Sequence, residues 1–221
     1  MASPSRTTGP RPNYDLSELQ LVGDYNRSNV LCAAALAEAA GVPHDVIQKT
    51  IPTLQPRWGR LEEVKSKSEK VKARVFVDFA HTPDGLEKVL SAVRKTMQAP
   101  SLWVVFGAGG DRDPMKRPLM GEACAKLADK LVVTSDNPRS EDPLKIIDAI
   151  LVGVNRTVGE SERSDNVFIE PDRRKAIEFA LANAAEGDVV IIAGKGHETT
   201  QEIKGVKYPF DDRESVREYA K

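Results

Sequence analysis

The sequence predicts an α/β fold: a Rossmann-like, mostly parallel sheet with helices on both faces, preceded by a small helical segment. From Arg60 onward, short apolar runs alternate with helical stretches, which is the pattern of repeated strand–helix units. The runs LWVVF at 102–106 and VVIIA at 189–193 are apolar without alternation. Continuous apolar runs are typical of parallel strands that are covered on both faces.

The chain starts with MASPSRTTGPRPNYD, a stretch rich in Ser, Arg and Pro and poor in acidic residues. We predict a flexible leader over residues 1–20. A plastid transit peptide has a similar composition and is the alternative, although the stretch shows no amphipathic, arginine-rich helix.

A small helical segment is predicted over residues 21–57. Asn29–Ala40 is rich in Ala and Leu and contains no helix breaker, and Gly41 and Pro43 follow it in the usual order of a helix stop. His44–Lys49 is predicted to form a second, short helix. A segment of this size is too small to be a stable domain by itself.

Residues 58–221 are predicted to form the main domain. Its strands are expected at Val75–Phe79, Leu102–Phe106, Leu131–Thr134, Val167–Glu170 and Val189–Ala193. Its helices are expected at Leu86–Met97, Leu119–Ala128, Pro143–Val152, Asp172–Ala185 and Asp211–Tyr219, with Asp172 as an N-cap.

The composition excludes several classes of protein. The 32 basic and 33 acidic residues give a formal net charge of -1, which argues against a nucleic-acid binder and against an anionic membrane surface as partner. No apolar run approaches the ~20 residues of a membrane-spanning helix. Cys32 and Cys124 are too few for a disulfide framework and lack metal-site spacing. A reducing, cytoplasmic location is therefore expected.

Polar residues follow the predicted strands, at the sheet edge where ligands bind in such folds. Arg112 and Arg139 each follow a strand, and arginine can hold a carboxylate through two hydrogen bonds. Asn137 and Glu198 follow strands as well. The two arginines together with Glu198 could hold a zwitterionic amino acid, the arginines taking carboxylates and the glutamate an ammonium.

Other interpretations of these loops are weaker. Gly107 and Gly109 could begin a dinucleotide fingerprint, but its third glycine position is Arg112. The stretch GKGH at 194–197 lacks the remainder of a P-loop, and no P-loop pattern occurs in the chain. His81 and His197 could be metal ligands, but structural roles are favoured, and no metal site is predicted.

Several of these segments together resemble the carboxy-terminal half of the Mur ligase family, in its diaminopimelate-adding branch. The matching segments are FAHTPDGLE (79–87), FGAGGDRDPMKRPLM (106–120), TSDNPRSEDP (134–143), AGKGHE (193–198) and PFDDRE (209–214). The segment YNRSN at 25–29 with the Ala-rich helix resembles the end of the family's central ATPase domain. On this resemblance, residues 21–57 are the helical tail of that domain and 58–221 the carboxy-terminal domain.

The resemblance implies an ATP-dependent ligase of peptidoglycan synthesis, and so of cell-wall formation, cell shape and cell division. Such a ligase joins an amino acid to UDP-MurNAc-L-Ala-D-Glu, using ATP and Mg²⁺ held largely by other domains. It implies a binding site for the amino acid at Arg112, Asp136, Asn137, Pro138, Arg139, Gly194 and Glu198. It also implies a nucleotide side at Asn29, Arg60, Asp78 and His81, and it assigns no catalytic residue.

The resemblance makes Asp136-Asn137-Pro138-Arg139 the family's signature for meso-diaminopimelate. Diaminopimelate is lysine with a second carboxylate at its far end, and lysine would leave an arginine there unpaired. Losing a buried charged pair costs about 2–5 kcal/mol, so diaminopimelate is predicted over lysine.

The chain lacks the family's P-loop and UDP-sugar domain, so we expect it to be inactive by itself. The alternative function is a non-catalytic amino-acid-binding or scaffold protein derived from such a ligase, possibly in a plastid.

Overall fold

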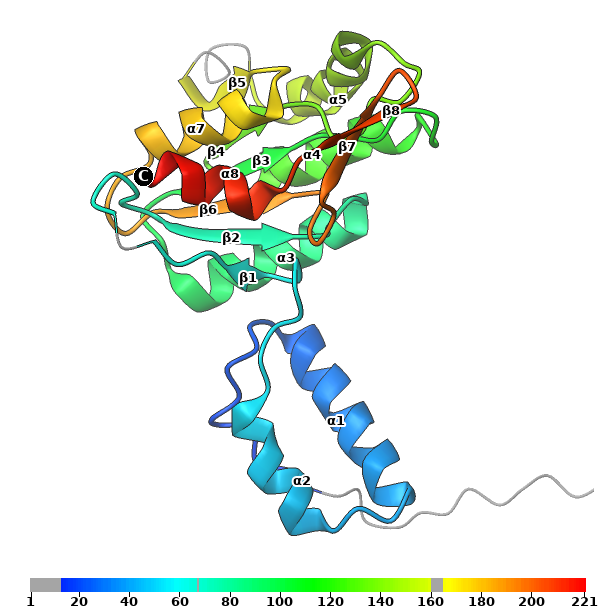
Figure 1. The fold of residues 1–221 in the computed structure, drawn as a ribbon, viewed down its shortest axis with the longest axis vertical. Helices are drawn as coiled ribbons and strands as arrows, with labels where there is room; N and C mark the ends of the chain where they lie inside the picture. Colours follow the sequence, from blue (N-terminus) through cyan, green and yellow to red (C-terminus); the bar gives the residue numbers. More distant parts are fainter. Residues whose placement is uncertain (1–12, 67, 160–164) are drawn as a thin grey trace, which may run out of the picture. The chain divides into compact units, whose positions relative to one another are not determined.

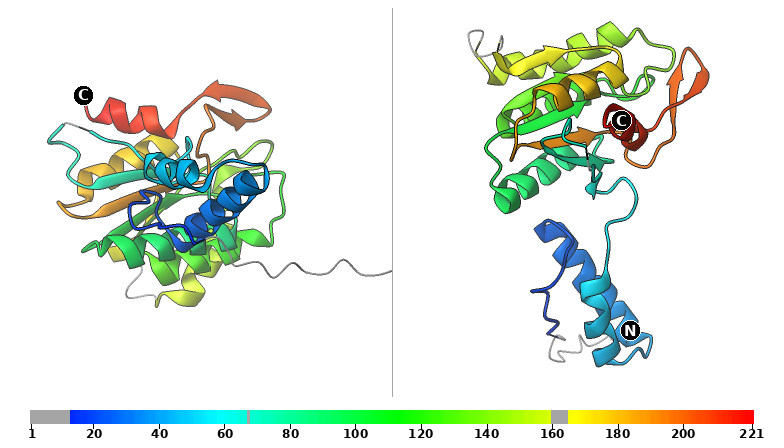
Figure 2. Two further views of the ribbon diagram at one scale, coloured as in Figure 1. Left: turned by 90° about the horizontal axis from the view of Figure 1, so that it is seen from below. Right: turned by 60° about the vertical axis from the view of Figure 1, so that its left-hand side comes forward.

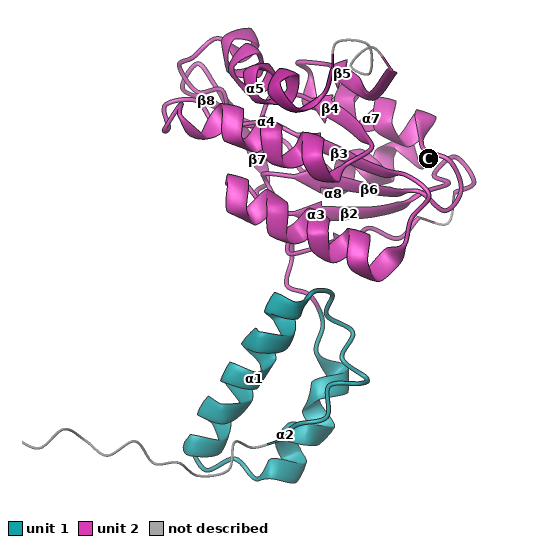
Figure 3. Ribbon diagram, turned by 180° about the vertical axis from the view of Figure 1, so that it is seen from behind, with its two compact units in different colours: residues 1–55 teal, residues 56–221 magenta. Residues whose placement is uncertain are grey.

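The computed structural model describes residues 13–66, 68–159 and 165–221. The chain divides into two compact units, residues 1–55 and 56–221 (Figure 3). Among the described helices, none is both long enough and apolar enough to cross a membrane.

The first unit is built from α1 (Asp24–Ala39), α2 (His44–Thr50) and the short 3-10 helix η1 (Ile51–Thr53). Its core contains six buried side chains: Tyr14, Leu16, Val30, Ala34, Ile47 and Ile51. Of the predicted leader 1–20, residues 1–12 lie outside the described residues. From residue 13 onward this stretch contributes buried Tyr14 and Leu16, because its apolar side chains alternate and can reach the two helices.

The second unit contains a six-stranded sheet in the order β1-β2-β6-β3-β4-β5, which confirms the predicted fold class (Figure 1). All neighbouring strands pair in parallel except β1 and β2. The strands are β1 (Glu62–Glu63), β2 (Arg74–Asp78), β3 (Leu102–Phe106), β4 (Lys130–Val133), β5 (Val167–Ile169) and β6 (Val189–Ala193).

Helices cover both faces of this sheet. Helices α7 and α8 lie on the face toward the viewer in Figure 1, and α3, α4 and α5 lie on the opposite face in Figure 3. Their bounds are α3 (Pro83–Met97), α4 (Lys116–Leu127), α5 (Pro143–Thr157), α7 (Arg173–Asn183) and α8 (Asp212–Tyr219). Because both faces are covered, every residue of β3 and β6 is buried, as their continuous apolar runs predicted.

The structure adds two elements that the sequence pattern did not indicate. One is β1, a two-residue strand antiparallel to β2. The other is a hairpin of β7 (Thr200–Ile203) and β8 (Val206–Pro209) after the last buried strand (Figure 2). Both are short and polar or exposed, so they lack the apolar periodicity on which the prediction depended.

Several element boundaries differ from the predictions. Helix α4 starts three residues earlier than predicted and α5 ends five residues later. Boundary shifts of this size are expected when only periodicity marks the ends. Asp172 is confirmed as the N-cap of α7, since its carboxylate accepts hydrogen bonds from the backbone N–H groups of Arg174 and Lys175.

The two cysteines differ in burial, which predicts a difference in reactivity. Cys124 is fully buried in α4, and burial raises the pKa of its thiol well above the ordinary value, whereas Cys32 is exposed. The thiolate is the reactive form. We therefore expect the native chain to take up one equivalent of a thiol reagent and the denatured chain two, with mass spectrometry locating the native label at Cys32. A Cys32→Ser variant that still labels in the native state would contradict this.

Candidate amino-acid site

The carboxyl ends of β2, β3, β4 and β6 surround a cavity of about 360 Å³. Parallel strands place the residues that follow them at one edge of the sheet, and ligands bind there in such folds. The cavity brings together six of the seven predicted amino-acid-binding residues: Arg112, Asp136, Asn137, Arg139, Gly194 and Glu198. The seventh, Pro138, does not line the cavity.

The loop Asp136–Arg139 is held on one side by the loop that follows β3. The backbone N–H of Gly110 donates to the carbonyl of Asn137 at 2.9 Å. A Cβ atom at Gly110 would lie 1.9 Å from the carbonyl oxygen of Pro138, so only glycine permits this approach. Pro138 therefore acts through its backbone, as a packing partner of Gly110, and its ring is not part of the cavity wall.

The hairpin β7–β8 holds the same loop on its other side. The Gln201 side chain donates to the carbonyl of Asp136 at 2.8 Å, and the backbone N–H of Glu202 donates to Oδ1 of Asn137 at 2.9 Å. Arg139 has a φ of 52°, in the left-handed region that a residue with a Cβ rarely adopts. Its N–H donates to the carbonyl of Glu202, and its own carbonyl accepts from Lys204. These two bonds hold Arg139 in that conformation.

The two predicted carboxylate-binding arginines differ in how they are held. Nη1 of Arg139 donates to the carbonyl of Gly110 at 2.7 Å, and its Nε lies 3.7 Å from Oε2 of Glu202. Arg112 is exposed and makes no hydrogen bond or ion pair with the residues that the structure describes. One arginine is thus fixed in direction, and the other is free to turn toward a ligand.

At another part of the wall, Glu198 belongs to a compact polar cluster. Its Oε2 accepts from Nδ2 of Asn137 at 2.9 Å and from Nζ of Lys195 at 3.1 Å. Lys195, whose side chain is completely buried, also donates to Oδ1 of Asn137. Burial raises the pKa of Glu198, but the Asn137 hydrogen bond and the Lys195 charge outweigh it, so the pKa lies below the ordinary value. Glu198 is therefore an anion at neutral pH.

Asp136 is the buried acid of the site. The residue is 8% exposed, and its Oδ2 has no hydrogen-bond partner in the described residues. Burial raises its pKa above the ordinary value, although Arg173 and Lys195 act in the opposite direction. A buried carboxylate oxygen without a donor is costly unless a ligand supplies one. An ammonium group would supply that donor.

The sequence interpretation missed three charged residues that shape this site. Lys195 lies inside the AGKGHE segment, and no role in the site was predicted for it. Arg117 is buried and donates to both carboxylate oxygens of Glu141, at 2.9 and 2.7 Å, beside the cavity. Arg173 lies in α7, outside the loops that follow the strands. The one sequence signal for it is its position on the apolar face of that helix, where a charged residue is unusual.

The residues predicted for the nucleotide side gather in part around Phe79. The Arg60 guanidinium lies over the Phe79 ring at 4.8 Å, and His81 packs against it edge-on at 4.6 Å. Both are exposed. The Asp78 oxygens accept from the backbone N–H groups of Leu61 and Ala80 at 2.6 and 2.7 Å, so both are already engaged. Asn29 lies on α1, in the other compact unit.

The side chains around Phe79 differ in how well they suit a nucleotide or a metal ion. A cation and an imidazole beside an aromatic ring suit a phosphate or a base. Both oxygens of Asp78 already accept a backbone hydrogen bond, and no group of three or more His, Cys, Asp or Glu among the described residues is placed to hold a metal ion.

A Rossmann-like sheet with a pocket at the carboxyl ends of its strands defines a ligand-binding α/β domain, and comparison with known families gives its class. The sequence model described as "Mur ligase, glutamate ligase domain" matches residues 59–196. The chain belongs to the Mur ligase family.

The relatives belong to one branch of that family. The chain is 48% identical over 205 residues to the UDP-N-acetylmuramoyl-L-alanyl-D-glutamate–2,6-diaminopimelate ligase of Aquifex aeolicus, covering 93% of this chain and 40% of that protein. It is 43% identical over 198 residues to the ligase of the same name from Vibrio vulnificus, covering 90% and 38%. The chain thus spans about two fifths of the length of these relatives.

Solved structures agree with this fold. A structure of a diaminopimelate ligase of the same name matches with a TM-score of 0.67 and 38% identity, over 91% of this chain and 39% of that one. A folylpolyglutamate synthase of Mycobacterium tuberculosis, solved with ADP, matches with a TM-score of 0.62 at 21% identity, over 92% of this chain and 42% of that one. At that identity the second likeness shows the fold alone.

Proposed function

We propose that this chain supplies the amino-acid site of an ATP-dependent ligase that adds meso-diaminopimelate to UDP-MurNAc-L-Ala-D-Glu in peptidoglycan synthesis. The observation that carries the proposal is the cavity itself, which combines two arginines with a buried, partly unpartnered acid cluster. The relatives from Aquifex aeolicus and Vibrio vulnificus are ligases named for the same amino acid. The cytoplasm is the proposed location, with a plastid as the alternative.

The charges of the cavity match the two ends of diaminopimelate. Arg139 and Arg112 offer guanidinium groups for carboxylates, and the fixed direction of Arg139 suits a carboxylate at a set distance. Asp136 and Glu198 offer anionic oxygens for an ammonium. Lysine would satisfy the acid cluster, but it has no second carboxylate for an arginine. Arg139 is therefore proposed to select diaminopimelate.

The family resemblance implies that, in the full ligase, the glutamate carboxylate of the UDP-linked dipeptide would take the γ-phosphoryl group of ATP with release of ADP, and that attack by the amino acid's amine on the carboxyl carbon would then release phosphate and form the peptide bond. The residues of this chain bind and orient the incoming amino acid, so that its free amine faces the activated carboxyl carbon of the D-glutamate. Arg60 and His81 are proposed to contact the nucleotide, with Asp78 holding the backbone beside them. Holding two reactants in attack geometry is a large part of such catalysis.

Calorimetry on the purified chain tests this proposal. We expect meso-diaminopimelate to bind and L-lysine to bind about 30-fold more weakly or worse, which is the effect of leaving one charged pair unmade. Equal affinities for the two would contradict the assignment of Arg139. No binding of diaminopimelate would overturn the proposed site.

A second measurement separates a ligase part from a non-catalytic binding protein. The chain is incubated with ATP, Mg²⁺, UDP-MurNAc-L-Ala-D-Glu and diaminopimelate, and phosphate release is followed. We expect none, because no P-loop is present in the chain. Restoration of release by the remaining part of a relative such as the Aquifex aeolicus ligase would support the ligase role. Failure to restore it would favour the binding-protein alternative.

A further inference from the structure

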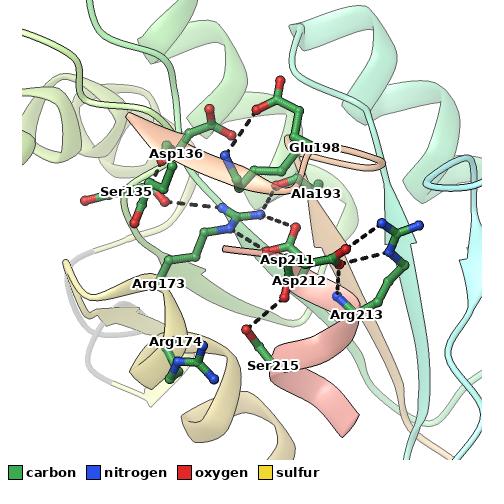
Figure 4. A network of polar contacts seen from close by, with 12 residues as sticks. Ser135, Asp136, Arg173, Arg174, Ala193, Glu198, Asp211, Asp212, Arg213 and Ser215 are labelled. Carbon is green, nitrogen blue, oxygen red and sulfur yellow. Dashed lines mark hydrogen bonds and ion pairs between the residues drawn. The ribbon is translucent and has the colours of Figure 1, made fainter. Parts of the chain in front are cut away.

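Arg173 is a charged side chain with no accessible surface, at the first turn of α7. Its Nε and Nη2 donate to the two carboxylate oxygens of Asp212 in α8, at 2.8 and 2.9 Å, and Asp212 is equally inaccessible. Figure 4 shows the Arg173 guanidinium with Ser135 on one side and with Asp212 and Ala193 on the other. A buried ion pair of this kind is weak evidence of a stabilising role, so its position requires another explanation.

The remaining donors of Arg173 reach the backbone of both acid-bearing loops. Its Nη2 donates to the carbonyl of Ala193 at 2.9 Å, and its Nη1 donates to the carbonyl of Ser135 at 3.3 Å. These residues directly precede Gly194 and Asp136 in the chain. The Arg173 guanidinium therefore connects the carboxyl ends of β6 and β4, next to the cavity-lining residues Gly194 and Asp136.

The Asp136 carboxylate lies close to this group. A Cβ atom added at Gly194, which has a φ of 118°, would lie 2.5 Å from Oδ2 of Asp136 and 4.0 Å from Nη2 of Arg173. Gly194 thus leaves the space that the Asp136 carboxylate fills. Since Oδ2 has no hydrogen-bond donor among the described residues, the nearby positive charge is what supports the anion there.

The charges around Asp136 come from three elements. Arg173 comes from α7, Lys195 and Glu198 come from the loop after β6, and Asp212 comes from α8. With Asp136 itself, this is a set of three acids and two bases. One further positive charge, such as a substrate ammonium, would balance it.

We propose that Arg173, held by Asp212, is a positioning residue of the amino-acid site: it fixes the two strand-end loops and places a positive charge beside Asp136, which receives the substrate ammonium. The inference rests on the proposed function, because the ammonium is that of the proposed amino acid. Removing Arg173 removes the positive charge that opposes the effect of burial on Asp136, so the pKa of Asp136 rises further. Asp136 then becomes neutral at a higher pH and binds the ammonium less well.

The test uses a double variant, Arg173→Met with Asp212→Leu, in the full chain. Removing Arg173 alone would leave Asp212 buried without a partner and could unfold the domain, whereas replacing a buried pair by apolar residues is often tolerated. Asp212 itself raises the pKa of Asp136, but by less than Arg173 lowers it, so the pKa of Asp136 should still rise when both are removed. Arg174→Met is the matched control, because the neighbouring Arg174 also pairs α7 with α8, through Glu218, at the surface. Far-UV circular dichroism and thermal melting establish that each variant is folded.

Calorimetry with meso-diaminopimelate between pH 6 and pH 8.5 provides the readout. We expect the double variant to bind up to about tenfold more weakly than wild type at pH 6, the largest loss that a one-unit rise in the pKa of Asp136 can cause, and to approach wild-type affinity as the pH rises toward 8.5. Arg174→Met should follow wild type at every pH. Lysine affinity should fall by the same factor as diaminopimelate affinity, because both carry the ammonium.

The outcomes separate this inference from the proposed function. Wild-type affinity in the folded double variant, or a loss that is equal at all pH values, would overturn the positioning role while leaving the amino-acid site in place. A rescue by Arg173→Lys at pH 6 would support the role of the charge. Absence of diaminopimelate binding by the wild-type chain would overturn both.

Discussion

Replacing Arg139 with alanine is expected to reduce the affinity for meso-diaminopimelate about 30-fold or more, the effect of losing one charged pair at a partly buried site. The affinity for L-lysine should change less than about threefold, because lysine has no carboxylate for this guanidinium. Isothermal calorimetry with both amino acids measures the ratio. The loss of discrimination, more than the loss of affinity, is the diagnostic result.

Two variants control this prediction. Arg139→Lys keeps the positive charge but loses the planar fork, so we expect an intermediate loss of diaminopimelate affinity. Arg156→Ala removes an exposed arginine of α5 that does not line the cavity and should behave as wild type. If Arg139→Ala retained the wild-type preference for diaminopimelate, the distal carboxylate would have to bind elsewhere, and Arg112 would be the next candidate.

Replacing Gly110 with alanine is expected to damage the site through its backbone. The new Cβ would lie 1.9 Å from the carbonyl oxygen and 2.7 Å from the carbonyl carbon of Pro138, and neither backbone atom can swing aside. The loop that carries Asn137 and Arg139 must move, and overpacking of this kind costs about 1–3 kcal/mol. Melting should therefore occur about 2–12 °C lower, since 1 kcal/mol corresponds to roughly 2–4 °C for a chain of this size. Diaminopimelate binding should fall with it.

The neighbouring glycine provides the comparison. A Cβ at Gly109 would meet Nη1 of Arg139 at 2.9 Å and Cγ of Arg112 at 3.5 Å, which are side-chain atoms and can shift without moving the backbone. Gly109→Ala should therefore melt close to wild type, even if ligand affinity changes. Equal melting temperatures for Gly110→Ala and Gly109→Ala would show that the Asp136–Arg139 loop can adjust, contrary to the close contact in the structure.

The sequence was sufficient to predict the sheet and the acid-and-arginine character of the pocket. Buried strands such as Leu102–Phe106 and Val189–Ala193 are found with their observed bounds, because a strand covered on both faces must be apolar throughout. Arg112, Arg139 and Glu198 were identified because parallel strands deliver the residues that follow them to one edge. These are local properties of the chain, and local patterns encode them.

The structure alone decided how those side chains are held. The hairpin β7–β8 is short and exposed, yet its backbone fixes Arg139 and Asn137 through bonds that no periodicity encodes. Arg173 and Asp136 are 37 residues apart in the sequence numbering, and Lys195 is further along still. They come together because β6 and β4 lie on either side of β3. The loops that follow these two strands therefore lie at the same edge of the sheet, where Arg173 of α7 contacts both.

The fold class and the acidic and arginine side chains of the strand-end cavity thus follow from the sequence, and its motifs resemble one family. Only the three-dimensional contacts show which Asp136 oxygen lacks a donor, how Arg139 is held and which buried charges lie near them. The difference lies in the sequence separation over which each feature acts. Apolar periodicity and strand-end motifs act within a few residues along the chain, whereas the burial of Asp136 and the charges around it depend on contacts among α7, α8 and two strand-end loops.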